Sequence, residues 1–199
     1  MKTVISLDDI LLRDSSTDIV DCFLDFFEDA EVYALAHRPN RLLGPVERRK
    51  IHASFLSARS DNPRVLKKSS FLAPAACSKL FIPCSIDVIV NFSRGLSHGI
   101  KRCQQSHQLT YLYDFAHLPS RETWTEKFFG GYVTRWSVKE LNKINTLWCS
   151  SETLKSSLKN YVEKDIKVVR PFVNLHEFPP IPENVEKYFI ERTSLLCWI

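Results

Sequence analysis

Glycine is scarce in this chain, with only five among 199 residues. This scarcity excludes collagen-like repeats and long glycine-rich linkers. Hydrophobic residues make up 44% and charged residues 25% of the chain, a balance that is typical of a globular protein. The length corresponds to one ordinary domain, or to one large domain with a tail, and it is sufficient to bury a core.

Long uncharged apolar runs are also absent. Charged residues interrupt every window well before the roughly 20 apolar residues that a membrane-spanning helix needs. The first apolar run, residues 3–7, ends at Asp8 and Asp9, so it is too short for a signal peptide. We therefore expect a cytoplasmic protein with at most peripheral contact to the inner face of a membrane.

Paired cysteine spacing is a third absence, since none of the six cysteines forms a C-x-x-C pair. The spacing excludes a zinc site of the usual kind, and neither a metal nor a cofactor is predicted. Most of the cysteines stand beside apolar residues, which predicts small buried thiols in a reducing compartment. They are Cys22, Cys77, Cys84, Cys103, Cys149 and Cys197.

The net charge of +4 is distributed unevenly. Residues 1–37 hold two basic and nine acidic side chains, whereas residues 38–79 hold ten basic and two acidic ones. This basic block is compatible with a solvated face, a phosphorylated substrate, an anionic membrane surface or nucleic acid. Apolar neighbours favour the membrane, and the lack of an aromatic RNA-binding pattern ranks nucleic acid below it. The block includes Arg48, Arg49, Lys50, Arg59, Arg64, Lys67 and Lys68.

Strand and helix patterns alternate along the chain. This alternation predicts an α/β fold, a Rossmann-like doubly wound parallel sheet covered by helices on both faces. Helices are expected after the polar cluster 15–18, over residues 134–143, and from residues 150–152 to about 161. Strands are expected at residues 3–7, 31–35, 51–56, 86–92, 108–113, 146–149 and 166–169.

Polar side chains follow the strand predicted at residues 108–113. They are His117, Arg121 and Trp124, in the order H-x-P-x-R-x-x-W. Ligands of open parallel sheets bind outside the carboxyl ends of the strands, so this position indicates a ligand site. Arg121 suits a carboxylate or phosphate, because a guanidinium binds such groups through two parallel hydrogen bonds.

Two other strand ends are weaker candidates. Ser93, Arg94 and Gly95 follow the strand predicted at residues 86–92 and suit an oxygen-rich ligand, although an ordinary turn explains them equally well. The turn after the first strand holds Asp14, Ser15 and Ser16 where nucleotide-binding folds often place glycines. Capping of the following helix is the favoured role for this turn.

In this order and spacing, the segments resemble the N-terminal domain of glycosyltransferase family 4 enzymes, which have the two-domain GT-B architecture. The element from His117 to Trp124 is similar to the family's H-T-P-M-R-Y-x-W, and Cys149-Ser150-Ser151-Glu152 is similar to its N-S-E helix cap. Further similarity lies in residues 29–35, 54–56, 87–95 and 170–178. The resemblance covers about residues 1–180, and residues 181–199 are expected to form a linker and the start of a donor domain.

The resemblance implies transfer of a sugar from a nucleotide-sugar donor to a glycan or lipid-linked acceptor, usually without a metal. It implies that this domain serves the acceptor side, near a membrane that the basic block contacts. His117 would be the catalytic residue that contacts the transferred sugar. The implied acceptor-binding residues are Ser93, Arg94, Gly95, Arg121 and Trp124.

Two departures from the family bear on this activity. Asp14, Ser15 and Ser16 replace a Gly-Gly-Ala-Glu-like loop, and the missing glycines hinder close approach of a pyrophosphate. The E-x7-E motif of the donor domain is also missing, so a nucleotide-sugar donor is expected only together with a second domain. A truncated remnant, a subunit that pairs with a separate donor-domain polypeptide, and a non-catalytic module that binds glycans or anionic lipids remain open alternatives.

Overall fold

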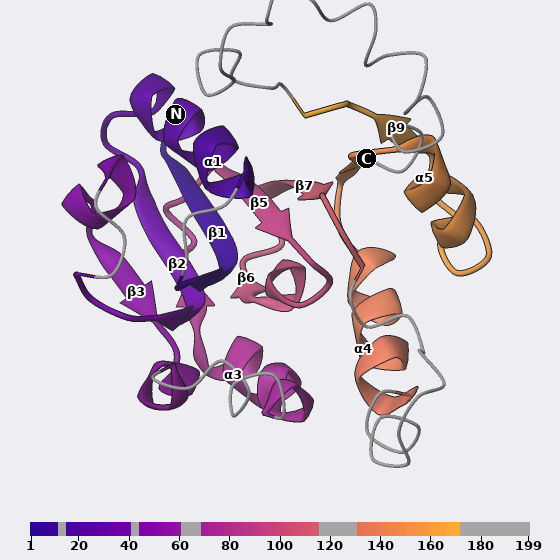
Figure 1. The fold of residues 1–199 in the computed structure, drawn as a ribbon, viewed down its shortest axis with the longest axis horizontal. Helices are drawn as coiled ribbons and strands as arrows, with labels where there is room; N and C mark the ends of the chain where they lie inside the picture. Colours follow the sequence, from indigo (N-terminus) through magenta and orange to yellow (C-terminus); the bar gives the residue numbers. More distant parts are fainter. Residues whose placement is uncertain (12–14, 41–43, 61–68, 116–130, 172–199) are drawn as a thin grey trace, which may run out of the picture.

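The computed structural model describes residues 1–11, 15–40, 44–60, 69–115 and 131–171. In this part of the chain a parallel seven-stranded sheet has the order β3-β2-β1-β5-β7-β8-β9 (Figure 1). Its strands are β1 (Thr3–Ile10), β2 (Glu31–His37), β3 (Ile51–Ala53), β5 (Val88–Ser93), β7 (His107–Leu112), β8 (Thr146–Cys149) and β9 (Ile166–Val168). A small separate sheet pairs β4 (Phe81–Ile82) with β6 (Lys101–Arg102).

Helices lie on both sides of the main sheet, which confirms the predicted Rossmann-like doubly wound α/β fold (Figure 1). The α-helices are α1 (Ser15–Phe26), α3 (Ala73–Lys79), α4 (Gly131–Leu141) and α5 (Glu152–Leu158). Short 3-10 helices are η1 (Pro45–Arg48), η2 (Phe55–Arg59), η3 (Ser70–Leu72) and η4 (Ser97–Gly99). The boundary expected at residue 180 lies outside the described residues.

The alternation of side chains along each strand divides the core between the two faces of the sheet. One set of residues packs against α1, while the other packs against α3 and α4. The α1 side includes Ile5, Leu7, Val32, Ala34, Val90 and Phe92 from the strands, with Val20 and Leu24 from the helix. The opposite side includes Val4, Tyr33, Leu35 and Ile89, with Ala76 and Cys77 from α3 and Trp136 from α4. A third cluster, around Leu141, Leu147 and Leu158, holds β8, β9 and α5 together.

Two strand ends differ from the prediction. β1 continues through Asp9 and Ile10, which pair with Ala36 and His37 of β2. Acidic residues do not end this strand, because the Asp9 side chain is exposed and the Asp8 carboxylate has hydrogen-bond donors. β3 is shorter than predicted because Ser54 caps η2, accepting a hydrogen bond from the Leu56 amide.

Elements α3, β4 and β6 were not predicted from the sequence. Only two residue pairs join β4 to β6, which is too short a strand to produce a period-2 hydrophobic pattern. α3 spans seven residues and begins with Ala73-Pro74, where proline suits the first helical turn. No helix within the described residues is long and apolar enough to cross a membrane.

The cysteines differ from the expectation. Cys77 and Cys149 are buried thiols, and burial raises the pKa of both. Cys22 is instead exposed, and Cys84 and Cys103 form a disulfide with a Cα–Cα distance of 5.0 Å. The prediction of buried free thiols is therefore wrong for these three. Cys22 lies on the exposed side of α1, and the pairing of β4 with β6 brings together Cys84 and Cys103, which are 19 residues apart.

Disulfides are typical of oxidising compartments, so the Cys84–Cys103 pair removes the basis on which a reducing compartment was expected. Cys197 lies outside the described residues.

The fit of Gly99 against α4 generates a stability prediction. A Cβ at Gly99 would lie 2.4 Å from Cζ2 of Trp136, a ring that also stacks on His98. Gly99→Ala should therefore lower the free energy of unfolding in urea by about 1–3 kcal/mol, the usual cost of overpacking. Gly131→Ala is the matched control, because no atom lies within 4 Å of its added Cβ, and its effect should be neutral or slightly stabilising. Equal stability of the two variants would contradict this packing.

Candidate functional site

The strand order places a topological switch point between β1 and β5. From β1 the chain proceeds outward through β2 to β3, then returns to form β5 on the other side of β1. Connections diverge from the carboxyl ends of β1 and β5, and open α/β sheets bind their ligands at such a point. The residues at this edge are Asp8 from β1 and the loop Ser93–Ser97 that follows β5.

Asp8 holds the loop after β5 in place. Its Oδ1 accepts hydrogen bonds from the Ser93 hydroxyl at 2.9 Å and the Ser97 amide at 2.6 Å. Its Oδ2 accepts the Arg94 amide at 2.7 Å. The side chain is buried, with 7% of Asp8 exposed. Hydrogen bonds to a carboxylate are stronger than those between neutral groups, so β1 fixes the conformation of this loop.

Ser93 supports the loop from beneath. Its Oγ accepts the amides of Gly95 at 2.9 Å and Leu96 at 3.1 Å, and it donates its single proton to Asp8. These bonds use both acceptor positions and the donor of the hydroxyl, and Ser93 is fully buried. Ser93 therefore shapes the loop, and its hydroxyl is not presented to solvent.

Gly95 is required by the loop geometry. Its φ of 115° lies in a region that residues with a Cβ rarely adopt. Its carbonyl accepts a hydrogen bond from the Ser137 hydroxyl of α4 at 2.7 Å. The glycine thus lets the loop turn sharply while it joins α4 to the switch point.

Arg94 presents the positive charge of the loop. Its side chain is half-buried, and its guanidinium carbon lies 5.1 Å from the ring centre of Tyr113 at the end of β7. The next strand end along the sheet also contacts this tyrosine, since the Ser150 hydroxyl donates to the Tyr113 carbonyl at 3.0 Å. Arginine, an aromatic ring and hydroxyls therefore occupy the carboxyl ends of three adjacent strands, β5, β7 and β8.

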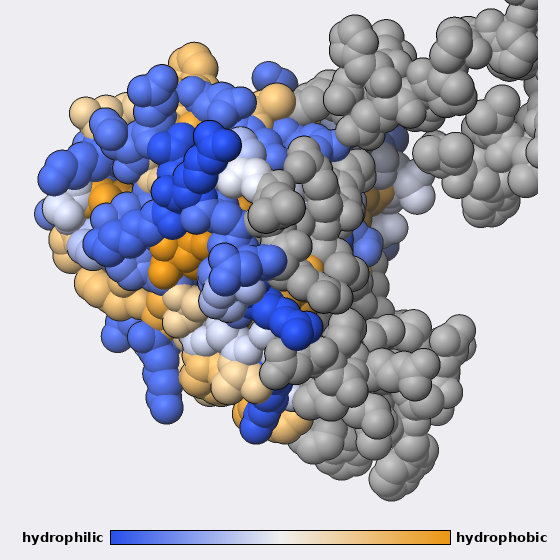
Figure 2. Space-filling model, turned by 60° about the vertical axis from the view of Figure 1, so that its left-hand side comes forward, coloured by the Kyte–Doolittle hydropathy of each residue, from blue (hydrophilic) through white to orange (hydrophobic). Residues whose placement is uncertain are grey.

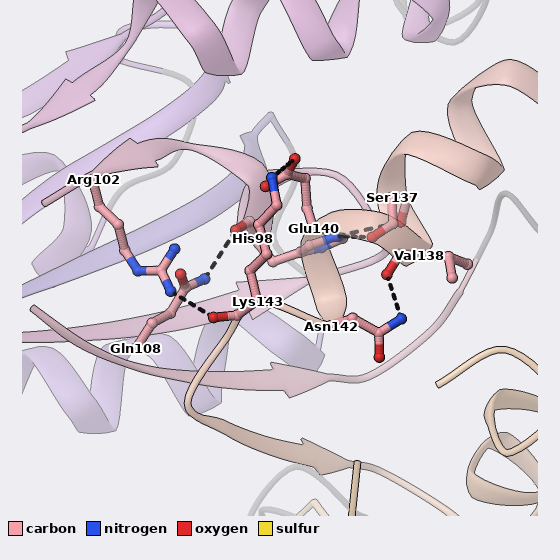
Figure 3. A network of polar contacts seen from close by, with 8 residues as sticks. All are labelled: His98, Arg102, Gln108, Ser137, Val138, Glu140, Asn142 and Lys143. Carbon is pink, nitrogen blue, oxygen red and sulfur yellow. Dashed lines mark hydrogen bonds and ion pairs between the residues drawn. The ribbon is translucent and has the colours of Figure 1, made fainter. Parts of the chain in front are cut away.

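A buried polar layer connects the loop to α4 (Figure 3). His98 Nε2 lies 3.0 Å from the Ser137 carbonyl, so it carries a proton and donates. Gln108 of β7 donates to the His98 carbonyl at 3.0 Å, and Arg102 donates to the Lys143 carbonyl just beyond α4 at 3.1 Å. His98 and Ser137 are both buried. These bonds fix α4 on the same loop that Asp8 anchors.

Asp8, Ser93 and His98 lie close together without forming a catalytic triad. In a triad the histidine accepts the serine proton and the carboxylate orients the histidine. Here the carboxylate takes the serine proton, and His98 Nδ1 is 3.4 Å from Ser93 Oγ. The group is structural. Among the described residues, no cluster of three histidine, cysteine or acidic side chains is arranged to hold a metal ion.

The remaining predicted site residues have different positions. Ser15 and Ser16 are the first residues of α1, so the helix begins within the polar cluster 15–18 and not after it as predicted. Asp14 lies outside the described residues. His117, Arg121 and Trp124 also lie outside them, although the strand before them and α4 after them are described. Their expected place after β7 stays a prediction.

The basic block is partly neutralised within the fold. Lys50 Nζ and His52 Nε2 contact the Glu31 carboxylate at 3.0 and 2.7 Å, and these hydrogen bonds, that of Lys50 first, lower the pKa of Glu31. Arg49 donates to the Leu24 carbonyl at 2.7 Å, and Arg59 lies 3.4 Å from the Ser69 hydroxyl. Arg64, Lys67 and Lys68 lie outside the described residues.

Comparison with known proteins found no matching family model and no matching curated protein. The sheet edge is therefore interpreted from its own geometry. The sequence had indicated Ser93, Arg94 and Gly95 in this place, but it had not indicated Asp8, Tyr113 or Ser137. An acidic residue directly at the end of an apolar strand was the available signal for Asp8.

Removal of the Asp8 carboxylate should release the loop after β5. Asp8→Ala leaves two amides and one hydroxyl without their acceptor, so the free energy of unfolding should fall by about 2–4 kcal/mol. Asp8→Asn should be nearly as harmful, because its NH₂ group would face an amide donor. The control is Asp9→Asn at the exposed neighbour, with an expected change within about 1 kcal/mol. Denaturant unfolding measures all three, and an Asp8→Asn variant as stable as wild type would contradict the anchoring role.

Proposed function

We propose that this domain is the acceptor side of a GT-B glycosyltransferase, where it binds a glycan or lipid-linked acceptor at the switch point. The observation that supports the proposal best is the position of the loop Ser93–Ser97. Asp8 fixes the backbone of this loop at the carboxyl edge of a Rossmann-like sheet. Arg94 and Tyr113 flank this loop. An aromatic ring beside a fixed cationic donor suits a sugar, which offers hydroxyls and an apolar ring face.

The proposed reaction is transfer of a sugar from a nucleotide-sugar donor to an acceptor hydroxyl. In this proposal the Arg94 side chain, on the turn that Gly95 allows, orients the acceptor. Arg121 and Trp124 extend its site, and His117 contacts the transferred sugar. The donor requires a second domain or a separate donor-domain polypeptide. Two features support this division: the first turn lacks glycines, and the amides of Arg94 and Ser97 already bond Asp8.

Substitution of Arg94 tests this proposal. A glycan array should identify a neutral oligosaccharide ligand, and Arg94→Ala should weaken its binding by roughly 10- to 100-fold, because one charged hydrogen-bonding group is lost. Lys167→Ala is the matched control, since Lys167 also lies over an aromatic ring, Trp148, but on β9 at the edge of the sheet. The proposal fails if no glycan binds the folded domain, or if both variants bind it as wild type does.

A second candidate, an anionic-lipid-binding module, is supported by an aromatic and basic face. Phe55, Phe71 and Phe81 are 42%, 39% and 46% exposed on η2, η3 and β4. Lys79 Nζ lies 5.4 Å from the ring centre of Phe55, and Lys101 is the partner of Phe81 in the β4–β6 pair. Figure 2 shows hydrophobic and hydrophilic residues side by side toward the lower edge of the coloured surface.

The segments that carry Phe71, Phe81, Lys79 and Lys101 are free of acidic residues. Residues 69–86 contain no acidic side chain, and neither do residues 94–106. Exposed aromatic rings insert at the boundary between lipid headgroups and acyl chains, while lysines attract anionic headgroups. This combination favours an anionic bilayer over a neutral one.

Sedimentation with vesicles tests the lipid-binding candidate. Binding to vesicles with about 30% phosphatidylserine should exceed binding to pure phosphatidylcholine, because each lysine near the surface contributes about 1 kcal/mol. The double variant Phe55→Ala/Phe81→Ala should reduce this binding at least several-fold. Phe26→Ala is the matched control, an 81% exposed phenylalanine on α1 in the acidic part of the chain. Equal binding to both vesicle types would contradict this candidate.

A further inference from the structure

The Cys84–Cys103 disulfide is the covalent cross-link of the described fold, and it closes a segment that matters for the site. Cys103 directly follows β6, and Cys84 follows β4 after one intervening residue, Pro83. Between them the chain forms β5, the loop Ser93–Ser97 and η4. The disulfide thus joins the two ends of the segment that carries the loop anchored by Asp8.

The backbone pairing of β4 with β6 is short, and the burial of Ile82 and Ile100 in one core cluster supports it. Their parallel pairing consists of Phe81 with Lys101 and Ile82 with Arg102. A two-stranded ribbon by itself is marginal in stability, and with two residue pairs this ribbon is very short. The covalent bond therefore stabilises a pairing that its hydrogen bonds maintain only weakly.

The segment from Gly95 to Arg102, which ends in β6, packs against α4. Arg102, next to Cys103, donates to the Lys143 carbonyl just beyond the carboxyl end of α4 (Figure 3). His98 and the Gly95 carbonyl hold Ser137 in the middle of the helix. A Cβ at position 99 would lie 2.4 Å from the Trp136 ring, so any larger residue there would force a shift. A shift of β6 would move this entire contact surface, from Gly95 to Arg102.

The disulfide is accessible from solvent. Cys84 is exposed, whereas Cys103 is half-buried. A thiolate can therefore attack Sγ of Cys84, which releases the Cys103 sulfur as a thiolate. A second thiol then displaces the mixed disulfide, so that two reductant thiols become one disulfide and the protein gains two electrons and two protons as two cysteine thiols.

We propose that Cys84–Cys103 is a redox-sensitive clamp that sets how firmly α4 packs on the loop after β5. In the oxidised protein the clamp fixes β6, and β6 fixes α4. Reduction by a small thiol or dithiol releases β6 from β4 and loosens α4 and the loop together. This inference goes beyond the proposed function, because it concerns the state of the site and does not depend on which ligand binds there.

Amide hydrogen exchange with and without dithiothreitol tests the clamp. Reduction should raise exchange in β6, η4 and α4 at least 10-fold, while β1 and β2 change little. It should also lower Tm by about 6–12 °C, the loss expected for opening a loop of about this length in a domain of this size. The variant Cys84→Ser/Cys103→Ser should match reduced wild type and should not respond to dithiothreitol. Cys22→Ser, at an exposed free thiol, is the matched control and should behave as wild type.

Two results would overturn the proposal. One is a non-reducing peptide map, made after alkylation of free thiols, in which Cys84 and Cys103 are both alkylated under oxidising conditions. The other is unchanged exchange in α4 after the map shows that the disulfide has been reduced. Reduction and reoxidation of the wild-type protein provide the same comparison where the double variant does not fold. Neither readout uses a glycan or a vesicle, so failure here is distinct from failure of the proposed function.

Discussion

The burial of the Asp8 carboxylate is the constraint on which the site depends. A buried carboxylate is stable only where donors surround it, and here the donors are the backbone of the loop after β5 and one serine hydroxyl. The loop must therefore turn back toward β1, and the turn requires the positive φ of Gly95. One buried acidic side chain near the carboxyl end of β1 thus determines the course of the chain at the switch point.

The two faces of the sheet have different roles because their buried side chains differ in polarity. The face against α1 is apolar, with Phe23 of the helix packed edge-on against Phe92. The other face carries a buried polar layer that includes Asn91 and Gln108, and the Asn91 amide donates to the Ser6 and Ser97 hydroxyls. Hydrogen bonds are directional, so those in this layer specify where η4 and α4 lie. The apolar face buries hydrophobic side chains, which stabilises the fold but does not specify the position of its helix as strictly.

The parallel sheet brings distant segments together at one edge. Arg94, Tyr113 and Ser150 come from three different connections, and the parallel register of β5, β7 and β8 brings them together. Hydrogen bonds from α4 then fix the loop that carries Arg94. A ligand bound at this edge would contact side chains whose backbone is held by buried groups, which limits the entropy lost on binding.

Much of the sheet was predictable because its strands are apolar, β-branched and separated by helical patterns. The apolar run at residues 86–92 and the alternation of strand and helix patterns around it predict the fold class. Ser151 indicates the start of α5, because serine is a common N-cap residue. The pairing of β4 with β6 was not predictable, since strands of two residues carry no periodic signal. The disulfide followed from that pairing, so cysteine spacing alone was misleading.

The candidate site was predictable in part for a related reason. Ser93, Arg94 and Gly95 stand after a recognisable strand, and strand ends are where ligands bind. The sequence predicts that the first strand ends before Asp8, because the backbone amides that bind its carboxylate lie 86 and 89 positions away and no sequence pattern indicates them. Tertiary hydrogen bonds of this kind appear only when the fold is known.

The amide hydrogens of Arg94 and Ser97 test the central role of Asp8 most directly. If the carboxylate anchors the loop, both amides should exchange with solvent at rates close to those of the central strands β1 and β5, although they belong to a loop. In Asp8→Ala both should exchange at least 100-fold faster. Exchange of both amides in the wild-type protein at the rate of an unprotected loop would contradict the account.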